Sequence, residues 1–169
     1  VLYADSNTRL AFVPAANFNG TINDLITFKA WDRTGPKSIT SSPTLLGSYV
    51  DETDGRAHSV KISADGNSAY ITYYDEAKCL HIINISDPAN PRLRGTYNTS
   101  GSPKGFALSA DGNTAFVADS ADGLDIVNVS NLANPTFRGN FNTSGSANNV
   151  ALSADGNTAF VADYESGLQ

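Results

Sequence analysis

The sequence of 169 residues has no methionine, one cysteine, one tryptophan and two histidines, and only 17% of its residues are charged. A lone cysteine, Cys79, cannot form an internal disulfide, so no disulfide framework holds the chain together. Eleven Lys and Arg against seventeen Asp and Glu give a formal net charge of −6, whereas nucleic-acid-binding proteins concentrate positive charge. No apolar run approaches the ~20 residues that cross a bilayer. We therefore expect no nucleic-acid partner and no direct membrane insertion in this segment.

An internal repeat dominates what the sequence does contain. The string Ser-Ala-Asp-Gly-Asn occurs at 63–67, 109–113 and 153–157, so successive copies begin 46 and then 44 residues apart. Stretches downstream of it match at the same offset of 44. The two additional residues of the first interval fall within 74–79, between expected strands, where a longer loop is tolerated.

Each repeat has the pattern of four short strands separated by turns. In the second copy the expected strands are 106–109, 114–118, 124–129 and 136–141, and the turn after the first contains an Asp-Gly pair, which favours a hairpin. Four strands in 44 residues leave no room for a helix of ~10 residues.

The third of these strands carries apolar side chains on both faces, with Leu124 and Ile126 on one and Val127 and Val129 on the other. A strand buried on both faces belongs to a sheet packed between neighbours. Four-stranded units of ~40–45 residues that need a neighbour on each side describe a β-propeller. A plain β-sandwich is the alternative.

The residues of this strand also carry a family resemblance. Residues 80–84 (Leu-His-Ile-Ile-Asn) and 124–128 (Leu-Asp-Ile-Val-Asn), together with 86–91 and 114–119, resemble the LVIVD repeats of bacterial propeller proteins. The resemblance covers about residues 45–169 and implies a propeller fold.

Four positions depart from the family pattern. Asn84 and Asn128 stand where the repeat usually has Asp, and His81 and Asp125 stand where it has an apolar residue. A carboxylate-dependent role at that strand end is therefore not implied.

Residues 43–169 are predicted to form an incomplete LVIVD-type propeller with units at about 45–92, 93–136 and 137–169, the last truncated, and with 45–51 as an outer strand. That makes about 2.5–3 blades, whereas closed propellers have ~4–8. We expect an all-β fold, a partial propeller that does not close, in a fragment of a larger protein. The uncovered sheet faces predict that the isolated fragment oligomerises.

Residues 1–42 do not follow the repeat. Residues 25–31 alternate apolar and polar side chains, as in a strand with one buried face. Pro14, the turn at 17–20 and the Ala-Trp-Asp at 30–32 resemble the closing strands of bacterial cadherin-like or immunoglobulin-like surface repeats. The resemblance implies the C-terminal part of a β-sandwich module ahead of the propeller.

A rival interpretation treats the same segment as a degenerate blade, because 4–8 is similar to 154–158 and 43–49 is similar to 135–141. In either case 34–42, with its glycine, proline and Ser/Thr cluster, is the expected linker.

No residue combination indicates catalysis. His58 and His81 have no partner at metal-ligand spacing, Cys79 has no companion His or Asn suggesting a nucleophile, and HExxH, CxxC and GxSxG motifs are absent. We expect hydrogen-bonded structural histidines and a packed cysteine. No catalytic and no cofactor-binding residue is predicted.

Recurring aspartates are the candidate metal ligands. If they converged at a propeller mouth they could bind Ca²⁺, and Asp32 could do so in a cadherin-like module. The favoured alternative is that each hydrogen-bonds the backbone of its own turn, so the metal ligands stay unknown and calcium is the one cofactor considered. The recurring positions are Asp65, Asp111 and Asp155 in the first turns and Asp75, Asp119 and Asp163 after the second strands.

These observations favour a noncatalytic propeller scaffold from a bacterial secreted or cell-surface protein, which presents loops to a protein or carbohydrate ligand. The alternative is part of a metal-dependent propeller hydrolase whose catalytic residues lie in other blades. An extracellular or cell-surface location is expected.

Overall fold

The computed structural model describes residues 44–52 and 55–169. The chain divides into two units, Val1–Thr44 and Leu45–Gln169, and the description below concerns the second. The cadherin-like or degenerate-blade segment at 1–42, including Asp32, lies outside the described residues.

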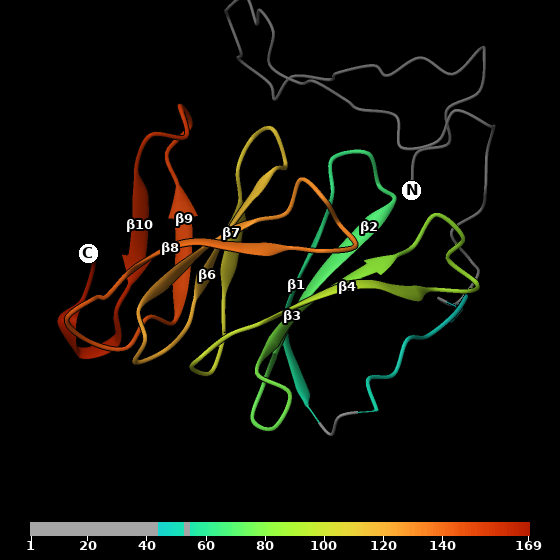
Figure 1. Ribbon diagram of the computed structural model, residues 1–169, viewed down its shortest axis with the longest axis horizontal. Coiled ribbons are helices and arrows are strands. Elements are labelled where there is room, and N and C mark those ends of the chain that lie inside the picture. The colour runs from blue at the N-terminus through green and yellow to red at the C-terminus, as the bar shows by residue number, and fades with distance from the viewer. Residues whose placement is uncertain (1–43, 53–54) are drawn as a thin grey trace, which may run out of the picture. The chain divides into compact units, whose positions relative to one another are not determined.

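The first sheet contains four antiparallel strands in sequence order (Figure 1): β1 (Arg56–Ile62), β2 (Ser68–Tyr74), β3 (Cys79–Asn84) and β4 (Arg92–Asn98). The turn between β1 and β2 places Gly66 at a φ of 75°, a conformation that glycine adopts without a steric penalty. The repeat therefore supplies the residue that the hairpin requires.

The second sheet has the same order: β5 (Phe106–Leu108), β6 (Thr114–Ala118), β7 (Leu124–Asn128) and β8 (Thr136–Phe141). The third unit forms β9 (Asn149–Leu152) and β10 (Ala159–Ala162), followed by a single 3₁₀ turn, Tyr164–Ser166. Leu168 then forms a bridge to Ala162, where the third strand of this unit is expected. No longer helix occurs in the described residues.

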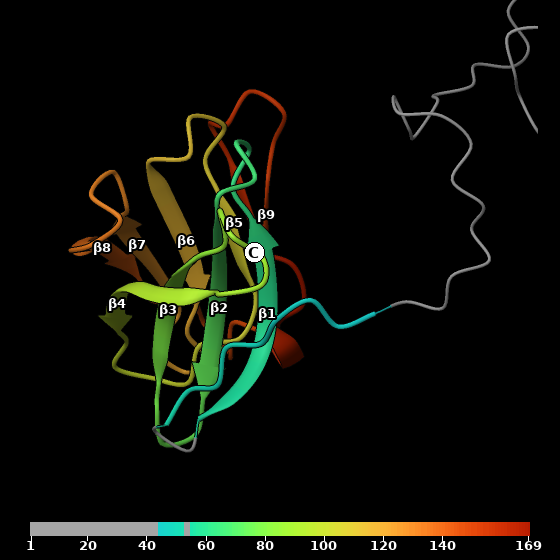
Figure 2. The same cartoon turned by 90° about the vertical axis from the view of Figure 1, so that its right-hand side faces the viewer.

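The sheets stand side by side with their first strands on the same side (Figure 2). Residues of β1, β5 and β9 line one shared hollow, while β4 and β8 lie at the opposite, outer side. The predicted all-β fold, a partial propeller that does not close, is confirmed.

Two apolar cores hold neighbouring sheets together. Val127 and Val129 face the first sheet, and Leu124, on the other face of the same strand, packs against the third unit. The prediction of a strand buried on both faces is therefore confirmed for these three side chains. The first core comprises Tyr70, Leu80, Ile82, Phe106, Ala115, Val117, Val127 and Val129. The second comprises Ala107, Ala118, Leu124, Ala147, Val150 and Val161.

The predicted outer strand at 45–51 is wrong. The described part of the chain forms no ladder there, because a strand requires a partner and no described strand pairs with this segment. It lies instead against the turn between β3 and β4, where a Cβ at Gly47 would come within 2.4 Å of the Pro88 carbonyl oxygen.

The same close approach recurs one repeat later. A Cβ at Gly95 in β4 would lie 2.2 Å from the carbonyl oxygen of Leu132, in the turn between β7 and β8. At Gly139 in β8, the next equivalent position, no described atom lies within 4 Å. The missing Cβ at Gly47 and at Gly95 thus lets the turn between the third and fourth strands of the next sheet approach the backbone closely.

Candidate functional site

The aspartates of the first turns hold their own turns. Asp65, Asp111 and Asp155 each accept the backbone N–H of the Asn two residues later, at 3.0, 3.0 and 3.1 Å. Each also accepts a hydroxyl from the preceding Ser of its Ser-Ala-Asp string. These hydrogen bonds, chiefly those from the serines, lower the pKa of each carboxyl. The prediction that they cap their own turns is confirmed.

The aspartates after the second strands do not form one set. Asp119 and Asp163 are fully buried and accept the N–H groups of Gly101 and Gly145, at 2.8 and 2.7 Å. They therefore fasten the loop that leads into their own sheet, and not their own turn. Asp75 is exposed and forms an ion pair with Arg56 at 3.3 Å.

The longer loop of the first unit explains this difference. Tyr73 precedes Asp119 by 46 residues, the spacing of the first two repeats, and is itself buried. The insertion follows it, so Tyr73 occupies the buried position and Asp75 is displaced to the surface. The position of these aspartates after the second strands did not by itself predict that Asp75 is exposed whereas Asp119 and Asp163 are buried.

The buried Asp119 differs from Asp163 in its hydrogen bonds. Thr143 donates its hydroxyl to Asp163 Oδ1 at 2.6 Å, whereas Thr99 donates to the Lys78 carbonyl and Asp119 Oδ1 has no partner among the described residues. Burial raises the pKa of Asp119 to about 6. The hydrogen bond from the Gly101 N–H lowers this pKa, and the nearby charge of Asp125 raises it further.

The histidines and the cysteine do not form a catalytic arrangement. His58 is exposed and packs edge-on to Tyr74. His81 is buried between the rings of Tyr49 and Tyr73, with centroids 6.2 and 5.0 Å away, and burial lowers its pKa. Its Nδ1 has no partner among the described residues, so the expected hydrogen bond at this atom is absent there.

Cys79 is also buried, and burial raises the pKa of its thiol to about 12. The sulfur is therefore protonated at neutral pH, and a thiol is a much weaker nucleophile than a thiolate. This agrees with the packing role predicted for it.

Within residues 44–52 and 55–169, no three His, Cys, Asp or Glu side chains lie close enough to hold a metal ion. The aspartates predicted as possible calcium ligands lie in separate turns and are not brought together. No helix in the part of the chain that the structure describes is long and apolar enough to cross a membrane.

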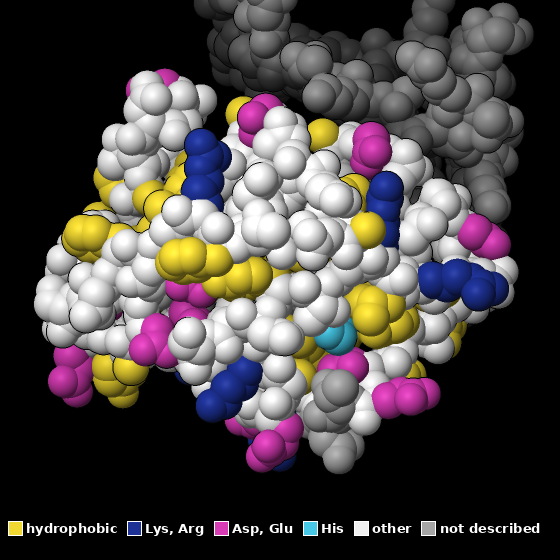
Figure 3. Space-filling model, viewed as in Figure 1, with side chains coloured by type: hydrophobic (Ala, Val, Ile, Leu, Met, Phe, Trp, Pro, Cys, Tyr) yellow, Lys and Arg dark blue, Asp and Glu magenta, His cyan; other side chains and the backbone are white. Residues whose placement is uncertain are grey.

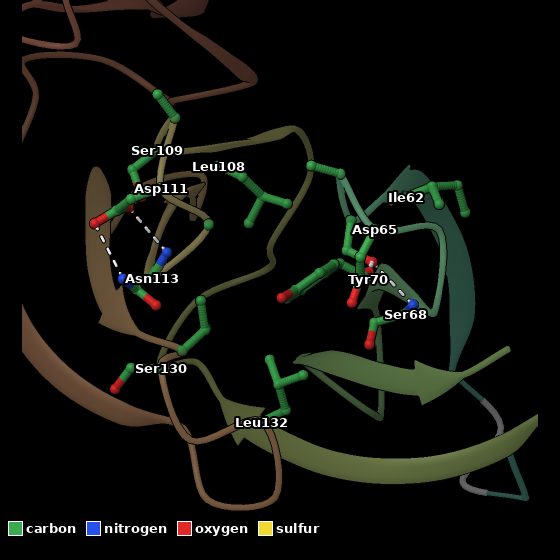
Figure 4. Close-up of a pocket in the computed structure, with 15 residues that line it drawn as sticks. Ile62, Asp65, Ser68, Tyr70, Leu108, Ser109, Asp111, Asn113, Ser130 and Leu132 are labelled. Atoms are coloured by element: carbon green, nitrogen blue, oxygen red, sulfur yellow. Dashed lines mark hydrogen bonds between the residues drawn. The ribbon is translucent and has the colours of Figure 1, made fainter. Parts of the chain in front are cut away.

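Two hollows lie between equivalent turns and strands of neighbouring sheets. One, of about 490 Å³, lies between the β1–β2 and β5–β6 turns, and the side chain of Tyr70 extends toward it beside Leu108 and Leu132 (Figure 4). Its rim carries Asp65 and Asp111, whose carboxylates are occupied by their own turns. The other, of about 440 Å³, lies between the first strands of the sheets.

A third hollow, of about 590 Å³, lies where β4 meets the outer strands of the second sheet. We call it the outer pocket. Asp125 in β7 is buried there, and accepts the Tyr97 hydroxyl at 3.1 Å and the Asn140 side-chain N–H at 2.9 Å. The outer pocket is lined by Tyr97, Asn98, Ser100, Ala121, Asp122, Asp125, Phe137, Asn140 and Asn142.

Sequence reasoning did not identify this group of residues. The available signal was that Asp125, like His81 in the first unit, replaces an apolar residue of the repeat pattern. Its partners could not be inferred, because Tyr97 belongs to the preceding sheet and Asn140 lies across the β7–β8 pair.

Antiparallel four-stranded sheets that pack face to face and share one side for their first strands define a β-propeller. The LVIVD repeat family matches residues 54–99, 106–143 and 144–169. The chain belongs to this family, as its strand motifs predicted.

Solved structures show the same fold. A protein from Lactobacillus plantarum is 18% identical, with a TM-score of 0.57 over 68% of this chain and 37% of its own. The Pseudomonas aeruginosa periplasmic gluconolactonase PpgL is 20% identical, with a TM-score of 0.53 over 63% and 33%. The β-propeller domain of Myceliophteria thermophila Cps50 (Swd1) is 18% identical, with a TM-score of 0.55 over 65% and 35%.

These identities establish the fold alone, and the chain spans about a third of the length of these proteins. A search of curated proteins finds no match.

Proposed function

We propose that this chain is part of a noncatalytic propeller scaffold in a bacterial secreted or cell-surface protein, where its loops and sheet junctions bind a protein or a carbohydrate. Membership of the LVIVD family gives the propeller fold, but a fold does not determine a function. The support for the noncatalytic role comes from the contacts of the polar side chains.

The observation that carries the proposal is that the recurring polar side chains are engaged in the fold. The aspartates of the first turns accept hydrogen bonds from their own turns. Asp119 and Asp163 fasten the loops that enter their sheets. A catalytic carboxylate must be able to reach substrate, and these are buried or already occupied.

The second candidate is a metal-dependent hydrolase with catalytic residues in blades outside this chain. The structural similarity to a gluconolactonase favours considering it. In this candidate the chain would contribute structure, and the chemistry would depend on residues that it does not contain.

Hydrolysis assays on the purified full-length protein, with every blade that accompanies this chain, separate the two candidates. We expect no hydrolysis of lactones or phosphoesters above the uncatalysed rate, with or without added Ca²⁺, Mg²⁺ or Zn²⁺, and no stoichiometric metal by elemental analysis. Metal-dependent turnover would contradict the scaffold proposal and favour the hydrolase.

The location is proposed from the resemblance of the sequence to bacterial propeller and surface repeats, and it is tested separately. We expect the protein in the medium or on the cell surface when cultures of the source organism are fractionated. Recovery in the cytoplasmic fraction would contradict the proposed location, and would leave the noncatalytic role to the hydrolysis assays.

A further inference from the structure

The outer pocket is built differently from the rest of the repeat. At the positions that align with Asp125, Asn140 and Asp122, the first unit has His81, Thr96 and Lys78. The first sheet nevertheless forms with the same strand order. The polar side chains of the outer pocket are therefore not required to make a blade.

The floor of the outer pocket is a fixed carboxylate. Asp125 is 5% exposed, and both of its oxygens accept hydrogen bonds from neutral donors, Tyr97 and Asn140. Asn140 is itself held by a second bond to the Asp122 carbonyl oxygen at 2.8 Å. No described cationic side chain forms an ion pair with Asp125. Each carboxylate oxygen has more than one acceptor position, so Asp125 can accept a further donor.

The Tyr97 hydroxyl is held as a donor in this network. Burial and the Asp125 carboxylate raise its pKa, so the phenol keeps its proton and donates to Asp125. Because Tyr97 comes from β4 and Asp125 from β7, the pocket exists only where two blades are packed together. Both blades have all four strands, so the pocket is complete in this chain.

The walls add uncharged polar groups and an aromatic ring. Asn98, Asn142 and Ser100 lie around the outer pocket, and Phe137 is 60% exposed at its side. Hydrophobic and acidic side chains lie next to each other over β8 (Figure 3). An exposed aromatic ring beside preorganised polar groups is typical of a binding surface.

We propose that the outer pocket binds a neutral saccharide. Sugar hydroxyls donate to carboxylate oxygens and accept from amide N–H groups, and the C–H face of a sugar ring packs against an aromatic side chain. The negative charges of Asp122 and Asp125 disfavour an anionic ligand. The amides of Asn98 and Asn142 also offer N–H donors, which a purely cationic ligand cannot use, whereas both side-chain N–H groups of Asn140 are already engaged. This inference rests on the proposed scaffold function and names its ligand class.

The test is a titration of the 169-residue protein with methyl glycosides of glucose, galactose, mannose and N-acetylglucosamine, followed by saturation-transfer NMR. We expect at least one of them to bind with a Kd of about 1 mM, as for small polar ligands in open pockets. Asp125→Asn and Phe137→Ser should each weaken it roughly tenfold or more. Asp75→Asn, which changes an exposed carboxylate in an ion pair elsewhere, should leave binding unchanged. Phe137 is exposed, so its variant keeps the test valid if Asp125→Asn does not fold.

Two probes of opposite charge test whether the ligand is neutral. Glucuronate should bind at least about tenfold more weakly than the neutral glycosides. Tighter binding of arginine amide than of any glycoside would overturn the inference in favour of a cationic ligand. Absence of glycoside binding, or binding that neither variant weakens, would also overturn it. None of these results bears on the scaffold proposal, which fails only if the hydrolysis assays detect turnover.

Discussion

The first and second sheets carry a glycine at the same position of the fourth strand, and its surroundings differ. Gly95 lies under the β7–β8 turn, with the Leu132 carbonyl where a Cβ would be, whereas Gly139 has no described atom within 4 Å. Ile82 in the first sheet is fully buried, while its equivalent, Ile126, is half-buried. Phe141, equivalent to Tyr97, is 62% exposed.

Two kinds of interaction therefore stabilise a blade, those within its own sheet and those with the next blade. The second sheet keeps its strand order and register, including β8, although the outer part of one face is uncovered. Hydrogen-bonded ladders and turns therefore form the sheet, and the next blade adds burial. Substitutions at equivalent positions measure how much that cover contributes.

The largest difference is expected between Gly95→Val and Gly139→Val. A valine at Gly95 would collide with backbone of the β7–β8 turn and should lower the free energy of unfolding by about 3 kcal/mol or prevent folding. At Gly139 the space is open and valine favours strands, so the change should stay within about 0.5 kcal/mol. Urea denaturation of both variants checks this, and equal losses would show that Gly139 is also covered.

The next difference is expected within the aspartates that follow the second strands. Asp163→Ala removes the acceptor of the Gly145 N–H and of the Thr143 hydroxyl and should cost about 2 kcal/mol, since buried donors lose their partner. Asp75→Ala breaks only an exposed ion pair and should cost at most about 0.5 kcal/mol. Thermal melting measures both. A large loss at Asp75 would contradict the assignment of Tyr73 to the buried position.

The sequence was sufficient to predict what depends on local pattern. The strand pattern, the turn glycines and the apolar faces of 124–129 follow from periodicity and from turn chemistry. The turn roles of Asp65, Asp111 and Asp155 follow in the same way, because their partners lie two residues away.

Contacts between residues that are far apart in the sequence could not be predicted in this way. The partner of Asp119 is Gly101, eighteen residues earlier, and the partner of Asp125 is Tyr97 in another sheet. The strand expected at 45–51 failed for a related reason: its own sequence matches the repeat, but strand formation depends on a pairing partner elsewhere.

A smaller, pH-dependent difference is expected between Asp119 and its amide variant. The folded state raises the pKa of Asp119 from 3.8 to about 6, so folding favours the protonated acid. The stabilisation that this protonation gives to the folded state is therefore greatest below about pH 4, and it is lost as the pH rises through 6. Asp119→Asn keeps an acceptor for the Gly101 N–H and does not ionise.

The variant should therefore gain stability over the natural chain between pH 4 and 7. We expect about 1–2 kcal/mol, less than the full shift implies, because the buried amide of the variant brings an N–H group to the side of the carboxyl that has no partner among the described residues. Folding lowers the pKa values of Asp65, Asp111 and Asp155, so these residues change the stability at lower pH and with the opposite sign. Both proteins contain them, so their effect cancels when the two unfolding free energies are compared. A difference in unfolding free energy that does not change with pH would contradict this account.

The weakest expected effect is self-association through the uncovered surfaces. Phe141, Phe160 and Leu168 are 62, 44 and 70% exposed, and exposed apolar patches beside sheet edges favour association. Sedimentation velocity should show a weight-average mass that rises with concentration, and Phe141→Ser should reduce the rise. A monomer at every concentration would contradict this prediction.

The central claim is that the repeats fold into separate sheets packed face to face, and methyl NOE measurements test it most directly. Cross-peaks should connect Leu80 and Ile82 of the first sheet with Val117 and Val127 of the second, and Leu124 with Val150 and Val161. Absence of these contacts, with Val127 and Leu124 facing the same neighbour, would contradict it and indicate a single continuous sandwich.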